Sequence, residues 1–83
     1  MRILERRLKA LANQRRLRIL QFLKREHSAT VTEIARALQL SLAATSEHLQ
    51  ILSHADIVVT RKRGTFVTYR LSLNQESPVR EIL

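Results

Sequence analysis

The sequence IVVTRKRGTFVTYRL, which runs from Ile57 to Leu71, decides the fold of this chain. Its first four residues are all β-branched, and the pattern from Thr65 onward has the period of two that is typical of a β-strand. Gly64, the only glycine of the chain, falls between these two runs, where a tight turn needs positive φ without steric cost. The stretch therefore predicts a β-hairpin that carries Arg61-Lys62-Arg63 beside its turn.

Two closely spaced helical patterns lie directly before the hairpin. The first is predicted over residues 33–38, after a short strand at residues 30–31, and Thr32 is expected to be its N-cap. The second is predicted from residue 42 to about residue 55. The link over residues 39–41 is short and ends in a serine that can cap the second helix, as a helix-turn-helix requires.

Helical patterns also precede this pair. Asn13 is expected to cap a helix that runs to about Glu26, and Leu4, Leu8 and Leu11 form an apolar stripe at helical spacing before it. The order of helices and basic hairpin is typical of a winged helix-turn-helix. We therefore predict a mainly α fold with a β-hairpin wing, in the order α-α-(β)-α-α-β-β, followed by a short C-terminal helix.

The chain has 83 residues, enough for a single winged-helix domain over residues 1–83. A domain of this size buries only about 60% of the surface that its unfolded chain exposes. With 45% hydrophobic residues but only two Phe, one Tyr and no Trp, its core must be mainly aliphatic. Such a core gives marginal stability, so we expect a homodimer in which a second subunit adds to it.

The charge of the chain attracts polyanions. Fifteen Lys and Arg against seven Asp and Glu give a formal net charge of +8. Nine of the basic residues lie between Arg2 and Arg25, and those from Arg2 to Lys9 are equally consistent with the solvated face of an amphipathic helix. On the hairpin, three adjacent cations repel one another unless an anion is close, so we expect them to bind phosphate. The alternative is that these charges deter edge-to-edge strand pairing.

The second helix of the helix-turn-helix has one face for the core and one for solvent. Thr45, Leu49 and Leu52 follow helical spacing and are expected to point inward. The outward positions are Ala43, Ser46, Glu47 and Gln50. The helix carries no Lys or Arg, which are the usual partners of guanine, but its amide, carboxylate and methyl groups can contact adenine, cytosine and thymine respectively. A plain amphipathic surface helix is the alternative.

Three blocks of sequence resemble the ArsR family of winged-helix transcriptional repressors. Residues 11–20 resemble the family's opening motif, with Gln14 in place of the usual proline. The second block resembles the family's recognition helix at Leu40, Ser41, Ser46, His48, Leu49, Leu52 and Ala55. The third resembles the family's wing at Gly64, Tyr69, Arg70 and Leu71. Together the blocks cover nearly the whole chain.

The resemblance implies a homodimer joined through its terminal helices, with two recognition helices in successive major grooves of double-stranded DNA and the wings beside the flanking minor grooves. The operator is then expected to be an imperfect palindrome whose half-sites lie about one helical turn, or a multiple of it, apart. The expected DNA-binding residues are Arg16, Ser41, Ala43, Thr45, Ser46, Glu47, Gln50, Arg61, Lys62, Arg63 and Thr65. Thr45 also fits the buried stripe.

The chain departs from the family's metal sensors, which carry a Cys-x-Cys motif in the helix that here begins near Thr32, or ligands on a long C-terminal helix. It has no cysteine, and His48 and His54 are six residues apart, which is not the spacing of a chelating pair. We expect no metal site and no cofactor; a metal or small-molecule effector is disfavoured but left open. Asp56 replaces the family's glycine after the recognition helix and is expected to shift the helix end by a residue.

The two ends of the chain are the expected dimerisation segments, residues 1–11 and 77–83. Ser77 followed by Pro78 predicts the N-terminus of a short helix. The apolar residues expected at the dimer interface are Leu4, Leu8, Leu11, Val79, Ile82 and Leu83. A sensing helix would lie beyond the last residue if the native protein continues.

These observations predict a sequence-specific, double-stranded DNA-binding transcriptional regulator, a repressor rather than an activator, that acts in the cytoplasm. The sequence contains no apolar run of membrane-spanning length and no signal-peptide pattern. A winged-helix module that binds other proteins is the alternative, because one fold serves many functions. An enzyme is disfavoured, since the chain has neither a cysteine nor a plausible Ser-His-Asp set.

Overall fold

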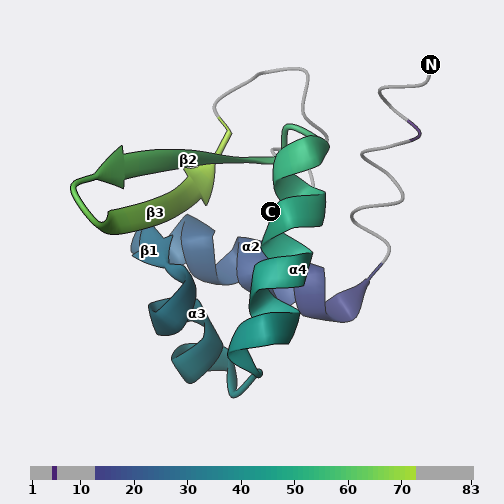
Figure 1. Ribbon diagram of the computed structural model, residues 1–83. Coiled ribbons are helices and arrows are strands. Elements are labelled where there is room, and N and C mark those ends of the chain that lie inside the picture. Colours follow the sequence, from purple (N-terminus) through teal and green to yellow (C-terminus); the bar gives the residue numbers. More distant parts are fainter. Residues whose placement is uncertain (1–4, 6–12, 73–83) are drawn as a thin grey trace.

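The computed structural model describes Glu5 and residues 13–72, and within them it confirms the predicted winged helix-turn-helix (Figure 1). In chain order the elements are α2 (Gln14–Glu26), β1 (Ala29–Thr30), α3 (Val31–Leu38), α4 (Leu42–His54), β2 (Val58–Arg63) and β3 (Phe66–Leu71). Apart from Glu5, the two expected dimerisation segments and the short C-terminal helix lie outside the described residues. The predictions for those segments therefore stay predictions.

Helix α2 begins at the expected N-cap. The side-chain oxygen of Asn13 accepts hydrogen bonds from the backbone N–H groups of Arg15, at 2.8 Å, and Arg16, at 3.3 Å. These bonds satisfy two of the donors that the first turn of a helix leaves unpaired. The buried face of α2 consists of Ile19, Leu20, Phe22 and Leu23.

Helix α3 begins two residues before its predicted start, and its N-cap is Thr30 rather than Thr32. The Thr30 hydroxyl accepts from the Glu33 N–H at 3.2 Å, while the Glu33 carboxylate accepts from the Thr30 N–H at 2.8 Å. This reciprocal capping box requires Glu or Gln three residues after the cap, a spacing that only Thr30 offers. The bond from the Thr30 N–H also lowers the pKa of Glu33, because it stabilises the carboxylate. The short strand is correspondingly one residue earlier than predicted.

Helix α4 has the predicted N-cap and a C-terminus that shows how Asp56 is accommodated. The Ser41 hydroxyl accepts from the Ala44 N–H at 3.1 Å. After His54, the Asp56 N–H donates a hydrogen bond to the carbonyl oxygen of Ser53, and the Ile57 N–H donates one to the carbonyl oxygen of Leu52. This is a Schellman motif, and it places Asp56 at φ 59°, in the left-handed region that favours glycine. The helix proper therefore ends one residue before its predicted limit.

The three strands form an antiparallel sheet in the order β1-β3-β2. The wing is β2 and β3, joined by the two-residue turn of Gly64 and Thr65, since Arg63 pairs with Phe66. Gly64 has φ 58°, whereas Thr65 is not at positive φ, as in the type II′ turns that suit hairpins. In Figure 1 the wing projects from the helical body, with its turn at the far left.

The core lies between the helices and one face of the sheet, and it is aliphatic apart from Phe22, as the composition predicts. Its buried members are Ile19, Leu20, Phe22, Leu23, Ala29, Ile34, Leu49, Leu52, Ala55, Ile57 and Val58. Within the described part of the chain, no helix is both long enough and apolar enough to span a bilayer.

Candidate nucleic-acid interface

The outward face of α4 is the one that periodicity predicts. All four of its members are exposed, and we call them the recognition stripe: Ala43, Ser46, Glu47 and Gln50. On the opposite side Leu49 and Leu52 are fully buried in the core. Because residues three and four positions apart lie next to one another on a helix, the stripe is one continuous surface.

Thr45 does not belong to that surface, and its expected place at the DNA-facing side is wrong. Its side chain is 0% exposed, and its hydroxyl donates a hydrogen bond to the carbonyl oxygen of Ser41 at 2.8 Å. A buried hydroxyl must find a partner inside the protein, and this bond provides one. Thr45 therefore fixes the first turn of α4.

The first turn of α4 also displays an apolar side chain that was not among the predicted site residues. Leu42 is 54% exposed, beside the exposed methyl group of Ala43. Four residues further on lies Ser46, which is the neighbour of Leu42 on the helix surface. The exposed face of α4 thus begins with two apolar residues and continues with polar ones.

Arg16, predicted to contact DNA, is hydrogen-bonded to a side chain of α4. Its Nε lies 3.4 Å from Nδ1 of His48, to which it donates a hydrogen bond. Partial burial lowers the pKa of His48, the charges of Arg16 and Arg15 lower it further, and Glu47 opposes them. The imidazole is therefore kept neutral, the state in which it can accept this bond.

Arg18 is likewise in contact with the helix-turn-helix. Its Nη2 donates to the carbonyl oxygen of Leu38, the last residue of α3, at 3.2 Å. A cation at this position complements the negative end of the helix dipole. Of the three arginines in the first half of α2, Arg16 and Arg18 thus bond to the helices that follow; Arg15 and Arg18 are exposed, and Arg16 is partly buried.

The three cations predicted on the wing are divided between its two faces. Successive side chains of a strand point to opposite faces, so β2 places Arg61 and Arg63 on one face and Lys62 on the other. All three side chains are exposed.

A third arginine, which sequence reasoning missed, completes the face of Arg61. Arg70 of β3 pairs with Val59, and side chains paired across strands share a face. Val59 is two residues before Arg61 in β2, so all three side chains lie on the same face. A hollow of about 270 Å³ opens on this face. It is lined by Ser28, Arg61, Arg63, Thr68 and Arg70. We call Arg61, Arg63 and Arg70 the arginine face; strand alternation together with the hairpin register is the signal that identifies its third member.

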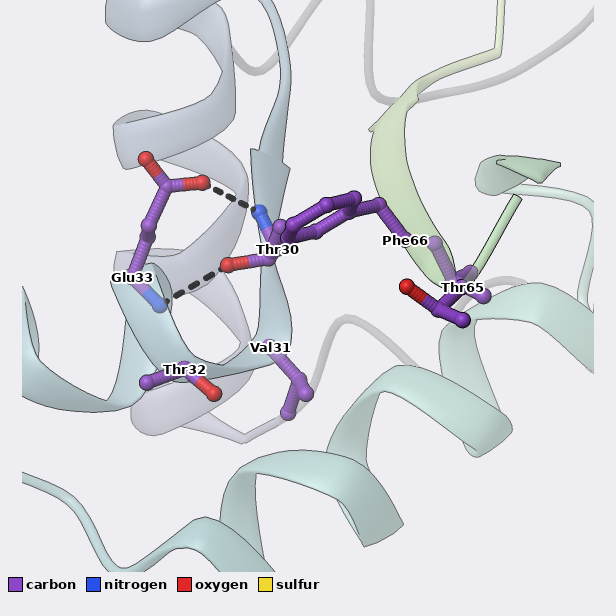
Figure 2. A pocket seen from close by; sticks show the side chains of 7 residues that line it. Thr30, Val31, Thr32, Glu33, Thr65 and Phe66 are labelled. Carbon is purple, nitrogen blue, oxygen red and sulfur yellow. Dashed lines mark hydrogen bonds between the residues drawn. The ribbon is translucent and has the colours of Figure 1, made fainter. Parts of the chain in front are cut away.

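A second hollow, of about 690 Å³, lies between the turn of the wing and the start of α3 (Figure 2). Its lining residues are Thr30, Val31, Thr32, Glu33, Thr65, Phe66 and Val67. Phe66 is 68% exposed, and Figure 2 shows its ring reaching toward Thr30. The lowered pKa of Glu33 keeps a negative charge beside this hollow, so it is a poorer place for phosphate than the arginine face. Thr65, a predicted DNA contact, lies at the exposed turn.

Metal-binding groups are not gathered in the part of the chain that the structure describes. Among Glu5 and residues 13–72, no three His, Asp or Glu side chains are placed to hold a metal ion together.

Comparison with known proteins places this geometry in a family of regulators. A family profile described as a helix-turn-helix domain matches residues 11–61. The chain is 41% identical over 76 residues to the transcriptional activator HlyU of Vibrio cholerae, an alignment that covers 92% of this chain and 69% of that protein. It is 40% identical over 63 residues to the arsenic resistance transcriptional regulator ArsR1 of Pseudomonas putida, covering 76% of this chain and 49% of the relative.

Solved structures share the fold. The homodimeric winged helix-turn-helix DNA-binding domain of Mb0332 from Mycobacterium bovis, described as a possible ArsR-family regulator, superposes with a TM-score of 0.80 at 38% identity, over 84% of this chain and 64% of that one. NolR from Sinorhizobium fredii superposes with a TM-score of 0.83 at 33% identity, over 98% of this chain and 77% of that one. The match extends over the helices and the wing together.

Proposed function

Because this chain belongs to the ArsR family of winged helix-turn-helix transcriptional regulators, we propose that it binds an imperfect palindromic operator in double-stranded DNA as a homodimer and represses transcription by occluding a promoter. The proposal places it in the cytoplasm with that DNA. As in its relatives, which are regulators, its activity is binding and not catalysis.

The observation that carries the proposal is the recognition stripe of α4. It is an exposed row of small and polar side chains on a helix whose other face is buried in the core, so the stripe is rigidly displayed. A helix of this width fits the major groove of B-DNA, where each base pair presents a distinct pattern of donors, acceptors and methyl groups. The stripe is therefore suited to base recognition.

Affinity and base choice are proposed to come from different surfaces. The arginine face of the wing supplies contacts to phosphate, which are independent of sequence and weaken with salt. The recognition stripe carries no Lys or Arg and so adds little of this electrostatic attraction. Sequence preference comes from the stripe and overall affinity mainly from the wing.

Dimerisation sets the form of the operator. The homodimeric state of the Mycobacterium bovis domain supports the same state here. Two copies related by a twofold axis present their α4 helices to half-sites about 10–10.5 base pairs apart, or a multiple of that spacing. We propose that residues 1–11 and 77–83 join the two copies.

Selection of bound sequences from a random duplex library, followed by footprinting, tests the proposal. The selected duplex should bind at least about 10³-fold more tightly than random duplex at physiological salt, and the footprint should show two half-sites. Equal affinity for selected and random duplexes would contradict sequence-specific regulation.

The direction of regulation needs its own assay, because one relative is named a transcriptional activator. Transcription in vitro from a promoter that overlaps the selected operator should fall as the protein is added. A rise in transcript would replace repression with activation and leave operator binding intact.

We further propose that regulation does not use a thiolate metal site, since the chain has no cysteine. Operator affinity should then be the same with zinc, with arsenite and with chelator. A change with any of these would identify an effector that binds through other groups.

A protein-binding module is the second candidate, and the exposure of Leu42 on a helix without cations favours it. The arginine face argues for DNA instead. Absence of binding to any duplex, even at low salt, would select the protein-binding function.

A further inference from the structure

We propose that α4 reads its half-site mainly through the 5-methyl groups of thymine, which Leu42 and Ala43 contact in the major groove. This inference rests on the DNA-binding function proposed above and names the base that the helix selects.

The first step is the exposure of two apolar residues at one end of the helix. In the described part of the chain, Leu42 and Phe66 are the only large hydrophobic side chains that are exposed, and Phe66 lies on the wing. A single exposed leucine is ordinary on a protein surface. Leu42, however, is continuous with the methyl group of Ala43, which belongs to the recognition stripe, and Leu42 borders a second member of that stripe, Ser46.

The second step is that this end of α4 is held firmly. The carbonyl oxygen of Ser41 accepts from both the backbone N–H of Thr45, at 3.0 Å, and its hydroxyl, at 2.8 Å. The Ser41 hydroxyl in turn accepts from the Ala44 N–H. Because Thr45 is fully buried, the turn that carries Leu42 is fastened to the core. In helix-turn-helix complexes, the first residues of the recognition helix are the ones that contact base edges.

The third step is the chemistry of those edges. Nitrogen and oxygen atoms dominate the floor of the major groove, and the methyl group of thymine is its one apolar projection. The polar edges offer Leu42 no partner, whereas a methyl group buries its surface without a desolvation cost. The usual contact to guanine requires Arg or Lys, and α4 contains neither.

Gln50 extends the same preference along the stripe. Its amide can pair with N6 and N7 of adenine, and each adenine has a thymine opposite it. Gln50 lies seven residues, or about two turns, beyond Ala43 on the same exposed side of the helix, so it approaches base pairs further along the groove than those that Leu42 and Ala43 approach. The half-site should therefore be rich in A·T pairs where α4 enters the groove.

Replacement of thymine by deoxyuridine, one position at a time, tests this in the selected operator duplex. Deoxyuridine keeps every hydrogen-bonding group and removes only the methyl. At one or two positions in each half-site, the replacement should weaken binding by about fourfold per methyl group. Deoxyuridine outside the footprint should have no effect.

A double-mutant cycle assigns the contact to its residue. Leu42 is about half exposed and lies outside the core, so the Leu42→Ala variant should fold normally. In this variant, deoxyuridine in place of the thymine that Leu42 contacts should cause no further loss of affinity. Gln50→Ala is the matched control from the same helix, and it should keep the full effect of deoxyuridine while losing preference for adenine. A deoxyuridine effect of equal size in wild type and Leu42→Ala would overturn the assignment.

The failure of this inference is distinguishable from failure of the proposed function. Tight and selective operator binding that is indifferent to every deoxyuridine would refute methyl recognition and leave the regulator intact. Binding without any sequence preference would refute both.

Discussion

Nε of Arg16 in α2 lies 3.4 Å from Nδ1 of His48 in α4, so a hydrogen bond joins the recognition helix to the helix that precedes the helix-turn-helix. Only a neutral imidazole has a lone pair for this bond. The same contact therefore fixes the position of the arginine and depends on the protonation state of the histidine. The contact between α2 and α4 therefore depends on pH.

This bond predicts that the free energy of unfolding falls below about pH 6.5. Folding lowers the pKa of His48, so above the ordinary value near 6.5 both folded and unfolded chains are neutral there. As the pH falls, the unfolded chain takes up the proton first, and stability is lost until the folded side chain is protonated as well. Urea unfolding at pH 7.5 and 5.5 should show the decrease.

His48→Gln is the control for this prediction, because glutamine accepts a hydrogen bond but does not titrate. Its unfolding free energy should depend less on pH than that of wild type, and the difference between the two proteins is the contribution of His48. An identical pH dependence in both proteins would show that His48 is not responsible.

The division of the wing cations between two faces predicts unequal roles in DNA binding. Alanine at Arg61, Arg63 or Arg70 should weaken binding to all duplexes and reduce the slope of log K against log salt by about one for each phosphate that is no longer bound. Lys62→Ala, in the same strand but on the other face, is the matched control and should change the slope less. Anisotropy titrations over a range of salt concentrations measure both quantities. Equal reductions of the salt slope for Lys62→Ala and Arg61→Ala would mean that the wing does not bind phosphate through the arginine face alone.

The parts of the fold that the sequence predicts are those set by local chemistry. Asn13 and Ser41 are recognisable as caps because a short polar side chain before an apolar helical pattern has few other roles. Gly64 marks the turn for the same kind of reason. Thr30 and Thr32 are equally good caps by residue type, and only the position of Glu33 decides between them.

The parts that it does not predict depend on residues far apart in the chain. Arg16 and His48 are 32 positions apart, and their contact follows from how α2 packs against α4. Arg70 joins Arg61 through the hairpin register, which a count of basic residues does not reveal. Base contacts by the recognition stripe, and DNA contacts by the arginine face and Thr65, stay predictions.

Thr45 should contribute to stability and not to DNA contact. Thr45→Val keeps the buried volume but removes the bond to the carbonyl of Ser41, which should lower the free energy of unfolding by about 1 kcal/mol. Thr45→Ser keeps the bond and removes a methyl group, and so separates hydrogen bonding from packing. Urea unfolding measures both variants. If Thr45→Val stays folded but loses its preference for the operator over random duplex, the residue has a direct role in recognition.

Asp56 occupies a backbone conformation that suits glycine, so Asp56→Gly should stabilise the domain. Its φ of 59° is left-handed, and its carboxylate follows the negative end of α4. Removing both should raise the free energy of unfolding by about 0.5–1 kcal/mol, after the extra entropy of glycine in the unfolded chain is subtracted. Asp56→Asn removes the charge alone and should give a smaller gain. Gly64→Ala makes the reverse change at φ 58° with no atom within 4 Å of the added carbon, so it should cost about 1 kcal/mol from the backbone alone. Thermal and urea unfolding that showed Asp56→Gly to be less stable than wild type would mean that the carboxylate has a stabilising partner.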